Sequence, residues 1–142
     1  MKISDRGLKL IREFEGVRHE AYQDSVGIWT IGVGHTGPDV CKGLLWTDEQ
    51  IDFALRVDVA DAERCVTQHV TLDLSQEQFD ALVSFVFNLG CGAFRGSKLL
   101  KLLNAGEVDA AGAQFSRWNK AAGMELAGLT RRRIAEKDMF LA

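Results

Sequence analysis

The sequence predicts an α+β fold, with one helix and a small sheet in the first 36 residues and several helices after them. Residues 28–33 are rich in β-branched and aromatic side chains and follow a turn signal at Val26-Gly27, which is typical of a short strand. From Thr47 onward the apolar residues recur at helical spacing. The length of 142 residues and the absence of a linker composition predict one domain, residues 1–142.

The first helix is expected to run from about Ser4 to Glu15. Serine is a favoured N-cap residue, and Gly16 is a typical helix terminator. At about 100° per residue, the apolar side chains of this segment fall on one broad face. That face consists of Ile3, Leu10, Ile11 and Phe14.

The small sheet is expected within residues 19–36. Because side chains alternate along a strand, Trp29, Ile31 and Val33 share one face. The opposite face carries Thr30, Gly32 and Gly34, and it is nearly bare of side chains. Such glycines let a ligand approach the backbone closely.

Two capping boxes, residues 47–50 and 75–78, predict the starts of two longer helices. The helix that begins near residue 47 has an apolar stripe of Ile51, Leu55, Ala62 and Val66. The helix that begins near residue 75 has a stripe of Phe79, Leu82, Val83 and Val86. Gly90 and Gly92 are expected to break the helix that begins near residue 75. Shorter helices are expected at 97–105 and 107–118. A last one is expected at 129–141, with Leu129, Ile134 and Phe140 facing inward.

The formal net charge of −3 argues against a general nucleic-acid binder. Residues 131–133 are three consecutive arginines, which suit either a solvated helix turn or contact with an anionic polymer or a carboxylate. The sequence has no apolar signal-peptide stretch and no membrane-spanning run, so the chain is expected to stay in the cytoplasm unless another agent releases it. Cys41, Cys65 and Cys91 are then expected to be reduced thiols that act as small buried hydrophobes.

Three glutamates near the end of the first helix could act as an acid: Glu13, Glu15 and Glu20. Glu13 falls on the charged side of that helix. Glu15 falls at the edge of the apolar face and at the helix C-terminus, where the dipole disfavours negative charge. This setting suits a proton donor, although a boundary glutamate paired with an arginine has the same pattern.

Asp24 follows Glu15 by nine residues, and Thr30 follows Asp24 by six. Two carboxyl groups are the parts needed to split a glycosidic bond, since one protonates the leaving oxygen and the other activates water or stabilises charge. Taken singly, Asp24 also fits an Asx turn, and Thr30 is an ordinary strand threonine. The compact acid–acid–hydroxyl set is therefore the most informative feature of the chain.

Other chemistries fit the sequence less well. Residues 32–37 match G-x-G-x-x-G, but Pro38 and Asp39 follow where a nucleotide-binding helix should begin. His35, Asp39 and Cys41 match no closed zinc spacing, so no metal or cofactor is expected, and His35 is expected to fix the sheet through a hydrogen bond. A Cys–His nucleophile pair such as Cys41 with His69 stays open, without specific support.

The ordered series of Glu15-Gly16, Tyr22-x-Asp24 and residues 30–36 resembles the phage-type lysozymes, the endolysin muramidase family. Residues 84–94 and 118–133 resemble the central-helix and C-terminal segments of that family, so the resemblance covers nearly the whole chain. It implies a lysozyme-like fold. In that fold a small N-terminal sheet lobe is joined by a long helix to a mainly helical C-terminal lobe, with an active-site cleft between them.

The resemblance also implies roles. Glu15 would be the general acid, Asp24 the second carboxylate and Thr30 a group that holds the attacking water, with Gly32, Gly34 and His35 as candidate substrate-binding residues. The substrate would be peptidoglycan, cut with inversion at the β-1,4 bond between N-acetylmuramic acid and N-acetylglucosamine.

The expected role is host-cell lysis for phage release, by a monomer without a stable membrane anchor. A holin would release the protein to the periplasmic peptidoglycan. One arginine of residues 131–133 is a candidate partner for Glu15.

Overall fold

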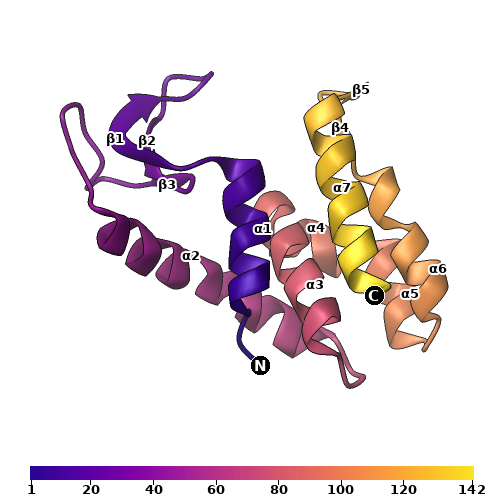
Figure 1. Ribbon diagram of the computed structural model, residues 1–142. Helices are drawn as coiled ribbons and strands as arrows, with labels where there is room; N and C mark the ends of the chain where they lie inside the picture. The colour runs from indigo at the N-terminus through magenta and orange to yellow at the C-terminus, as the bar shows by residue number, and fades with distance from the viewer. The chain divides into compact units, whose positions relative to one another are not determined.

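The computed structural model describes all 142 residues, in seven α-helices and two small antiparallel sheets (Figure 1). This is the α+β class that the sequence predicts. The chain divides into two compact units, one of residues 1–10 with 61–142 and one of residues 11–60. Helices α1 (Asp5–Glu15) and α2 (Asp48–His69) each contribute residues to both units.

Buried carboxylates hold the start of the chain. Ser4 caps α1 as predicted, because its hydroxyl accepts a hydrogen bond of 3.3 Å from the Gly7 N–H. Asp80 accepts hydrogen bonds from the Ser4 hydroxyl and, at 2.9 Å, from the Ser4 N–H. Glu63, which is also buried, accepts one of 2.7 Å from the Ile3 N–H. These bonds fix the entry of α1.

The unit of residues 11–60 is built on a sheet with the order β1 (Arg18–Gln23), β2 (Trp29–Gly32), β3 (His35–Thr36). The predicted turn and strand are present. Residues 44–46 run along the other edge of β1, where the Leu44 carbonyl accepts from Ala21 at 3.0 Å and the Trp46 N–H donates to His19 at 2.8 Å. The core of this unit is Ala21, Ile31 and Val40 with Trp29, Leu44 and Trp46.

Helix α2 begins with the predicted capping box, in which Thr47 and Gln50 exchange hydrogen bonds of 2.8 and 3.2 Å. Its apolar stripe is buried as predicted and gains Val59; the buried members are Ile51, Leu55, Val59, Ala62 and Val66. None of the helices combines the length and the apolar character that crossing a membrane requires.

The other unit contains α3 (Gln76–Leu89), α4 (Cys91–Arg95), α5 (Lys98–Asn104), α6 (Val108–Ala113), a 3-10 turn at Phe115–Arg117, the strand pair β4 (Lys120–Ala121) and β5 (Met124–Glu125), and α7 (Ala127–Phe140). The capping box at Ser75 and the apolar stripe of α3 are both confirmed. Gly90 ends α3 with φ of +92°, but Gly92 lies inside α4, so its prediction as a helix breaker is wrong.

Aromatic side chains fill the core of this second unit. The Phe85 ring meets Phe115 at 5.4 Å and Trp118 at 5.7 Å between centroids, both edge-on. Phe94 lies 6.2 Å from Phe85, and Phe140 of α7 lies 5.3 Å from Phe115. Edge-to-face geometry is the favoured arrangement for such rings. The rings therefore join α3, α4, the 3-10 turn and α7.

The inward face of α7 is charged, which corrects one prediction. Ile134 is 50% exposed, whereas Arg132, Arg133 and Glu136 are buried. The reason lies on α3, which packs against α7 and offers the polar side chains of Ser84 and Asn88. The prediction was based only on the apolar residues of α7, and the polar partners on α3 are distant in sequence.

Glu136 is the centre of a buried ion cluster. Its Oε2 accepts hydrogen bonds from the Ser84 hydroxyl at 2.5 Å and from Arg132 Nε at 3.3 Å. Its Oε1 lies 2.8 Å from Arg133 Nε, and Arg133 also donates to Asn88 at 2.7 Å. Burial raises the pKa of Glu136, while the two arginines and Ser84 act against that rise by favouring the carboxylate. Among the predicted alternatives for residues 131–133, the carboxylate contact holds for two of the three arginines.

Cys65 of α2 and Cys91 of α4 form a disulfide, with their Cα atoms 5.9 Å apart, and Cys41 is an exposed thiol. The prediction of three reduced, buried thiols is therefore wrong. The two bridged cysteines are 26 residues apart in sequence, and only the packing of α2 beside α4 brings them within disulfide range.

Replacing Glu136 with Gln is expected to lower the free energy of unfolding by about 3–5 kcal/mol, because two buried arginines lose a buried carboxylate partner. Asp138→Asn, at an exposed position on the same helix, is the matched control and should change stability by no more than about 0.5 kcal/mol. Urea unfolding followed by circular dichroism measures both values. A loss below about 1 kcal/mol in Glu136→Gln would mean that the cluster contributes little.

Candidate active site

Glu15 is the last residue of α1, and its carboxylate lies against a glycine turn. A Cβ atom built on Gly34, between β2 and β3, would be 3.1 Å from Glu15 Oε1. Gly34 also has φ of +69°, a conformation that side chains with a Cβ disfavour. Glycine at position 34 is thus what lets the Glu15 carboxylate approach the backbone of this turn.

Asp24, the residue after β1, forms the Asx turn that was the alternative interpretation of this position. Its Oδ1 accepts hydrogen bonds of 2.9 Å from the N–H groups of both Val26 and Ile28. Its Oδ2 accepts no hydrogen bond from the protein. One oxygen therefore fixes the carboxylate, and the other keeps its full capacity to accept a proton or a hydrogen bond.

Thr30 lies in β2 and is only 4% exposed. Its hydroxyl donates to the Ile28 carbonyl at 3.0 Å, so its single proton is used and its oxygen retains acceptor capacity. Ile28 thus contacts both polar groups, because its N–H binds Asp24 and its C=O binds Thr30. The backbone of one residue sets the orientation of both side chains.

Gly32 differs from Gly34. A Cβ on Gly32 would lie 3.3 Å from the Trp46 ring and 3.6 Å from Ile51, so the indole fills the space that was expected to admit a ligand. The alternation stops here because β2 ends at Gly32 and the turn follows. Of the two glycines, only Gly34 faces the carboxylate.

His35 makes the hydrogen bonds that its prediction as a structural histidine requires. Its Nδ1 lies 2.7 Å from Asp58 on α2, and its Nε2 lies 3.3 Å from Asp39. Partial burial acts to lower the pKa of His35, but the hydrogen bonds and charges of Asp58 and Asp39 outweigh it and raise that pKa. The hydrogen bond to Asp58 therefore ties β3 to α2.

A second ion pair joins α1 to α2 near Glu15, and it was not among the predicted contacts. Arg12 contacts Asp52, which also accepts a 2.9 Å hydrogen bond from Arg56. Arg56, and then Arg12, hold the pKa of Asp52 below its usual value. The i, i+4 spacing of Asp52 and Arg56 on a predicted helix favours an ion pair between them. No local sequence pattern indicates that Arg12 joins them.

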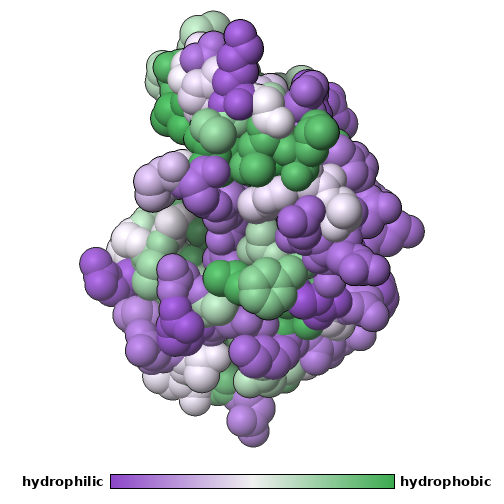
Figure 2. All heavy atoms as spheres, turned by 90° about the vertical axis from the view of Figure 1, so that its left-hand side faces the viewer, coloured by the Kyte–Doolittle hydropathy of each residue, from purple (hydrophilic) through white to green (hydrophobic).

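The opposite side of α2 lines a groove of about 470 Å³ beside His35 and Trp46. Its rim includes two apolar side chains that are unusually accessible, Phe53 at 71% and Val57 at 55% exposed. Figure 2 shows one face of the molecule, on which hydrophobic side chains interrupt a largely hydrophilic surface. The groove was not predicted.

Among His35, Asp39 and Cys41, which were considered as metal ligands, the structure brings His35 and Asp39 together. A cluster of three side chains of metal-binding types lies elsewhere, at Cys65, His69 and Cys91. Of the residues in the alternative Cys–His pair, Cys41 is an exposed thiol and His69 Nδ1 donates a 2.9 Å hydrogen bond to the Cys65 carbonyl.

A helix-end glutamate beside a small sheet that carries an aspartate and a threonine, with a helical unit after it, defines a lysozyme-like protein of the α+β class. The family model described as phage lysozyme matches residues 12–136. The chain belongs to the phage lysozyme family and is a lysozyme-type hydrolase.

Among its relatives is an endolysin of Acyrthosiphon pisum secondary endosymbiont phage 1, 43% identical over 99% of this chain and 98% of that protein. Two Bacillus phage endolysins also match, but the chain spans only about half of their length (54% and 55%).

Two solved structures are closely similar. A mutant of P22 lysozyme has a TM-score of 0.93 and 39% identity, covering 100% of this chain and 99% of its own. The muramidase domain of SpmX from Asticaccaulis excentricus has a TM-score of 0.91 and 42% identity, covering 99% and 98%.

The His35–Asp58 pair predicts a pH dependence. His35 should titrate above its ordinary pKa of 6.5, and Asp58→Asn should lower that pKa more than Asp39→Asn, which removes the longer contact. Because the folded-state pKa is raised, the stabilisation is fully present below pH 6.5 and is lost as the pH rises through the raised value. An NMR titration of the imidazole protons measures this. A His35 that titrates at or below 6.5 would contradict the pairing.

Proposed function

We propose that this protein is an endolysin muramidase that hydrolyses the β-1,4 bond between N-acetylmuramic acid and N-acetylglucosamine in peptidoglycan. The observation that carries the proposal is the position of the Glu15 carboxylate, in the space that a Cβ atom on Gly34 would approach, within the same unit as Asp24 and Thr30. Family membership supports it, as do the names endolysin and muramidase of similar proteins.

In the proposed mechanism Glu15 is the general acid. It donates its proton to the glycosidic oxygen as the bond to the anomeric carbon breaks, so that the leaving sugar departs as a neutral alcohol. Charge that develops on the sugar ring is then offset by a carboxylate on the other side of the reacting carbon. We assign that second role to Asp24.

Asp24 and Thr30 would hold the attacking water. Asp24 Oδ1 is occupied by two N–H groups, so Oδ2 is the oxygen that accepts the proton of the water. The Thr30 hydroxyl proton points to the Ile28 carbonyl, so its oxygen accepts the second hydrogen of the water. The water oxygen then has a lone pair for the anomeric carbon, and direct attack inverts the configuration.

We further propose that residues 1–142 act as one lysozyme-like domain and as a monomer. In this proposal the protein is made in the host cytoplasm and reaches the periplasmic peptidoglycan through a holin. The lysis of the host cell would then release the phage.

Replacing Glu15 with Gln should lower the rate of lysis by at least ~10²-fold, and up to ~10⁴-fold, because glutamine cannot donate the proton. Glu13→Gln, two residues earlier at an exposed position, is the matched control and should keep near-normal activity. The assay is the turbidity of outer-membrane-permeabilised cells, with new reducing ends counted in the digest. Near-normal lysis by Glu15→Gln would overturn the assignment, and new amino groups without reducing ends would indicate a peptidase or amidase.

Inversion predicts that the first product is the α-anomer, formed from a β-linked glycan. It also predicts a separation of roughly 6.5–9.5 Å between the Glu15 and Asp24 carboxyl groups, against about 5–5.5 Å for a retaining pair. Proton NMR of a soluble glycan digest, recorded before mutarotation, distinguishes the two anomers. A β-anomer that appears first would show retention and would assign Asp24 a nucleophilic role.

A further inference from the structure

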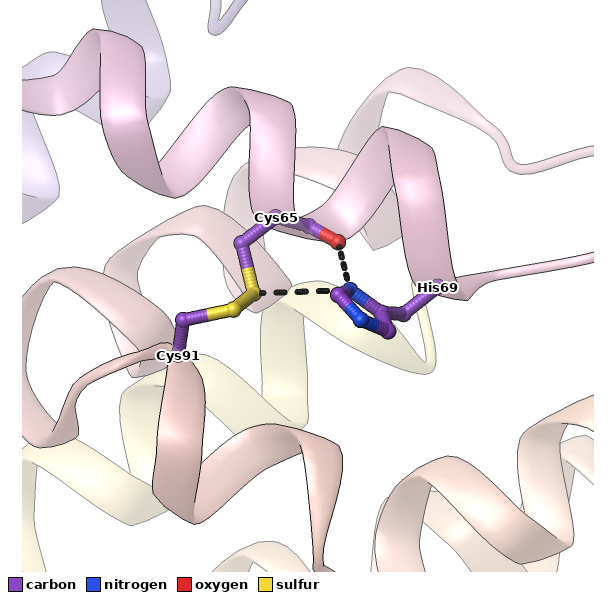
Figure 3. A group of neighbouring side chains, drawn as sticks. All are labelled: Cys65, His69 and Cys91. Carbon is purple, nitrogen blue, oxygen red and sulfur yellow. Dashed lines mark hydrogen bonds between the residues drawn. A yellow bond between two sulfur atoms is a disulfide. The ribbon is translucent and has the colours of Figure 1, made fainter.

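Cys65, His69 and Cys91 gather where α2 ends and α4 begins (Figure 3). Cys65 and His69 are four residues apart on one helix, so both point to the same side. Cys91 reaches them from the first residue of α4 through the disulfide. These three side chains have no part in the proposed glycan chemistry.

The three residues are ligand types for a zinc-like ion. Thiolates and imidazole bind Zn²⁺ at about 2.3 Å and 2.0–2.1 Å, which places two tetrahedral ligands about 3.5–3.8 Å apart. In the disulfide form His69 Nδ1 already lies 3.9 Å from Cys65 Sγ, and the three donor atoms all lie within 4.8 Å of one another. Reduction needs only to let the two sulfurs move apart to non-bonded contact.

We propose that the reduced form of this cluster binds one Zn²⁺-class cation through Cys65 Sγ, Cys91 Sγ and His69 Nδ1, and that the disulfide is the metal-free, oxidised form of the same site. Three protein ligands leave a fourth position for water. Cys65 is buried at 3% exposure, whereas Cys91 and His69 are half-buried, so the ion would enter from their side.

The two forms interconvert with a disulfide oxidant such as oxidised glutathione. One cysteine thiolate attacks the S–S bond of glutathione, which gives a mixed disulfide and one glutathione thiolate. The second cysteine thiolate attacks the mixed disulfide, which closes the Cys65–Cys91 bond and expels the second glutathione thiolate. The two electrons pass to glutathione, and the cation leaves as its thiolate ligands are consumed.

A proton competes with the cation at this site. In the disulfide form His69 Nδ1 is within hydrogen-bond distance, 2.9 Å, of the Cys65 carbonyl, where it acts as the donor. Binding the ion requires that proton to shift to Nε2, so that Nδ1 can act as a ligand, and both sulfurs to be thiolates, so binding releases the two thiol protons. The affinity should therefore fall as the pH is lowered.

The test is a Co²⁺ titration of the intact chain after reduction with a phosphine. We expect one equivalent to bind, with thiolate charge-transfer and tetrahedral d–d absorption bands. Cys91→Ser should abolish these bands, and Cys41→Ser, the matched control at the exposed thiol, should retain them. Oxidised protein should show none. The proposal is overturned if reduced protein binds no stoichiometric Co²⁺ or if Cys91→Ser keeps the bands.

Two further measurements guard against a folding defect in Cys91→Ser. His69→Gln retains both sulfurs and should weaken Co²⁺ binding at least about tenfold, since even outer-shell changes commonly cost that much. In the Cys41→Ser background, bound Zn²⁺ should slow disulfide formation by oxidised glutathione. Unchanged Co²⁺ affinity in His69→Gln would exclude His69 as a ligand. An oxidation rate that bound Zn²⁺ does not change would show that the metal is not held by the cysteines that form the disulfide.

Discussion

The buried ion cluster of α3 and α7 is the interaction on which the larger unit depends. The Glu136 carboxylate contacts Ser84, Arg132 and Arg133 at once, so these buried charges stabilise one another. The start of the chain follows the same rule, where buried Asp80 and Glu63 accept its backbone N–H groups. Apolar packing supplies the cohesion of this unit, but directional pairing of buried polar groups fixes which helix faces meet.

In the unit of residues 11–60, backbone geometry sets the position of the polar groups. The approach of Glu15 to Gly34 requires the absence of a Cβ atom, and Ile28 orients Asp24 and Thr30 through its own N–H and C=O groups. The Asx turn and the proposed catalytic role of Asp24 are therefore compatible, because the turn uses one carboxylate oxygen and leaves the other. A static scaffold of this kind costs little reorganisation when charge develops.

Sequence reasoning succeeded where the signal is local. A capping box, a turn or an apolar stripe is written within a few residues, and the starts of α1, α2 and α3 followed from such signals. It failed where the partner is distant. The charged face of α7 depends on Ser84, 52 residues before Glu136, and the disulfide joins cysteines 26 residues apart. In the site, strand alternation singled out Gly34, but the strand ends at Gly32, and Gly34 faces Glu15 from the turn that follows. The indole that fills the space beside Gly32 comes from Trp46 and could not be predicted locally.

The Cys65–Cys91 link also has a consequence for stability in either redox state. A cross-link that closes a loop of 26 residues stabilises a fold by about 3–4 kcal/mol through the loss of unfolded-state entropy. A cation held by both sulfurs would close the same loop, so the end of α2 stays joined to α4 in both forms. Helix α2 also carries Asp52 and Asp58, which bind Arg12 and His35. A site that accepts a cation when reduced and forms a disulfide when oxidised would preserve that anchoring under both reducing and oxidising conditions.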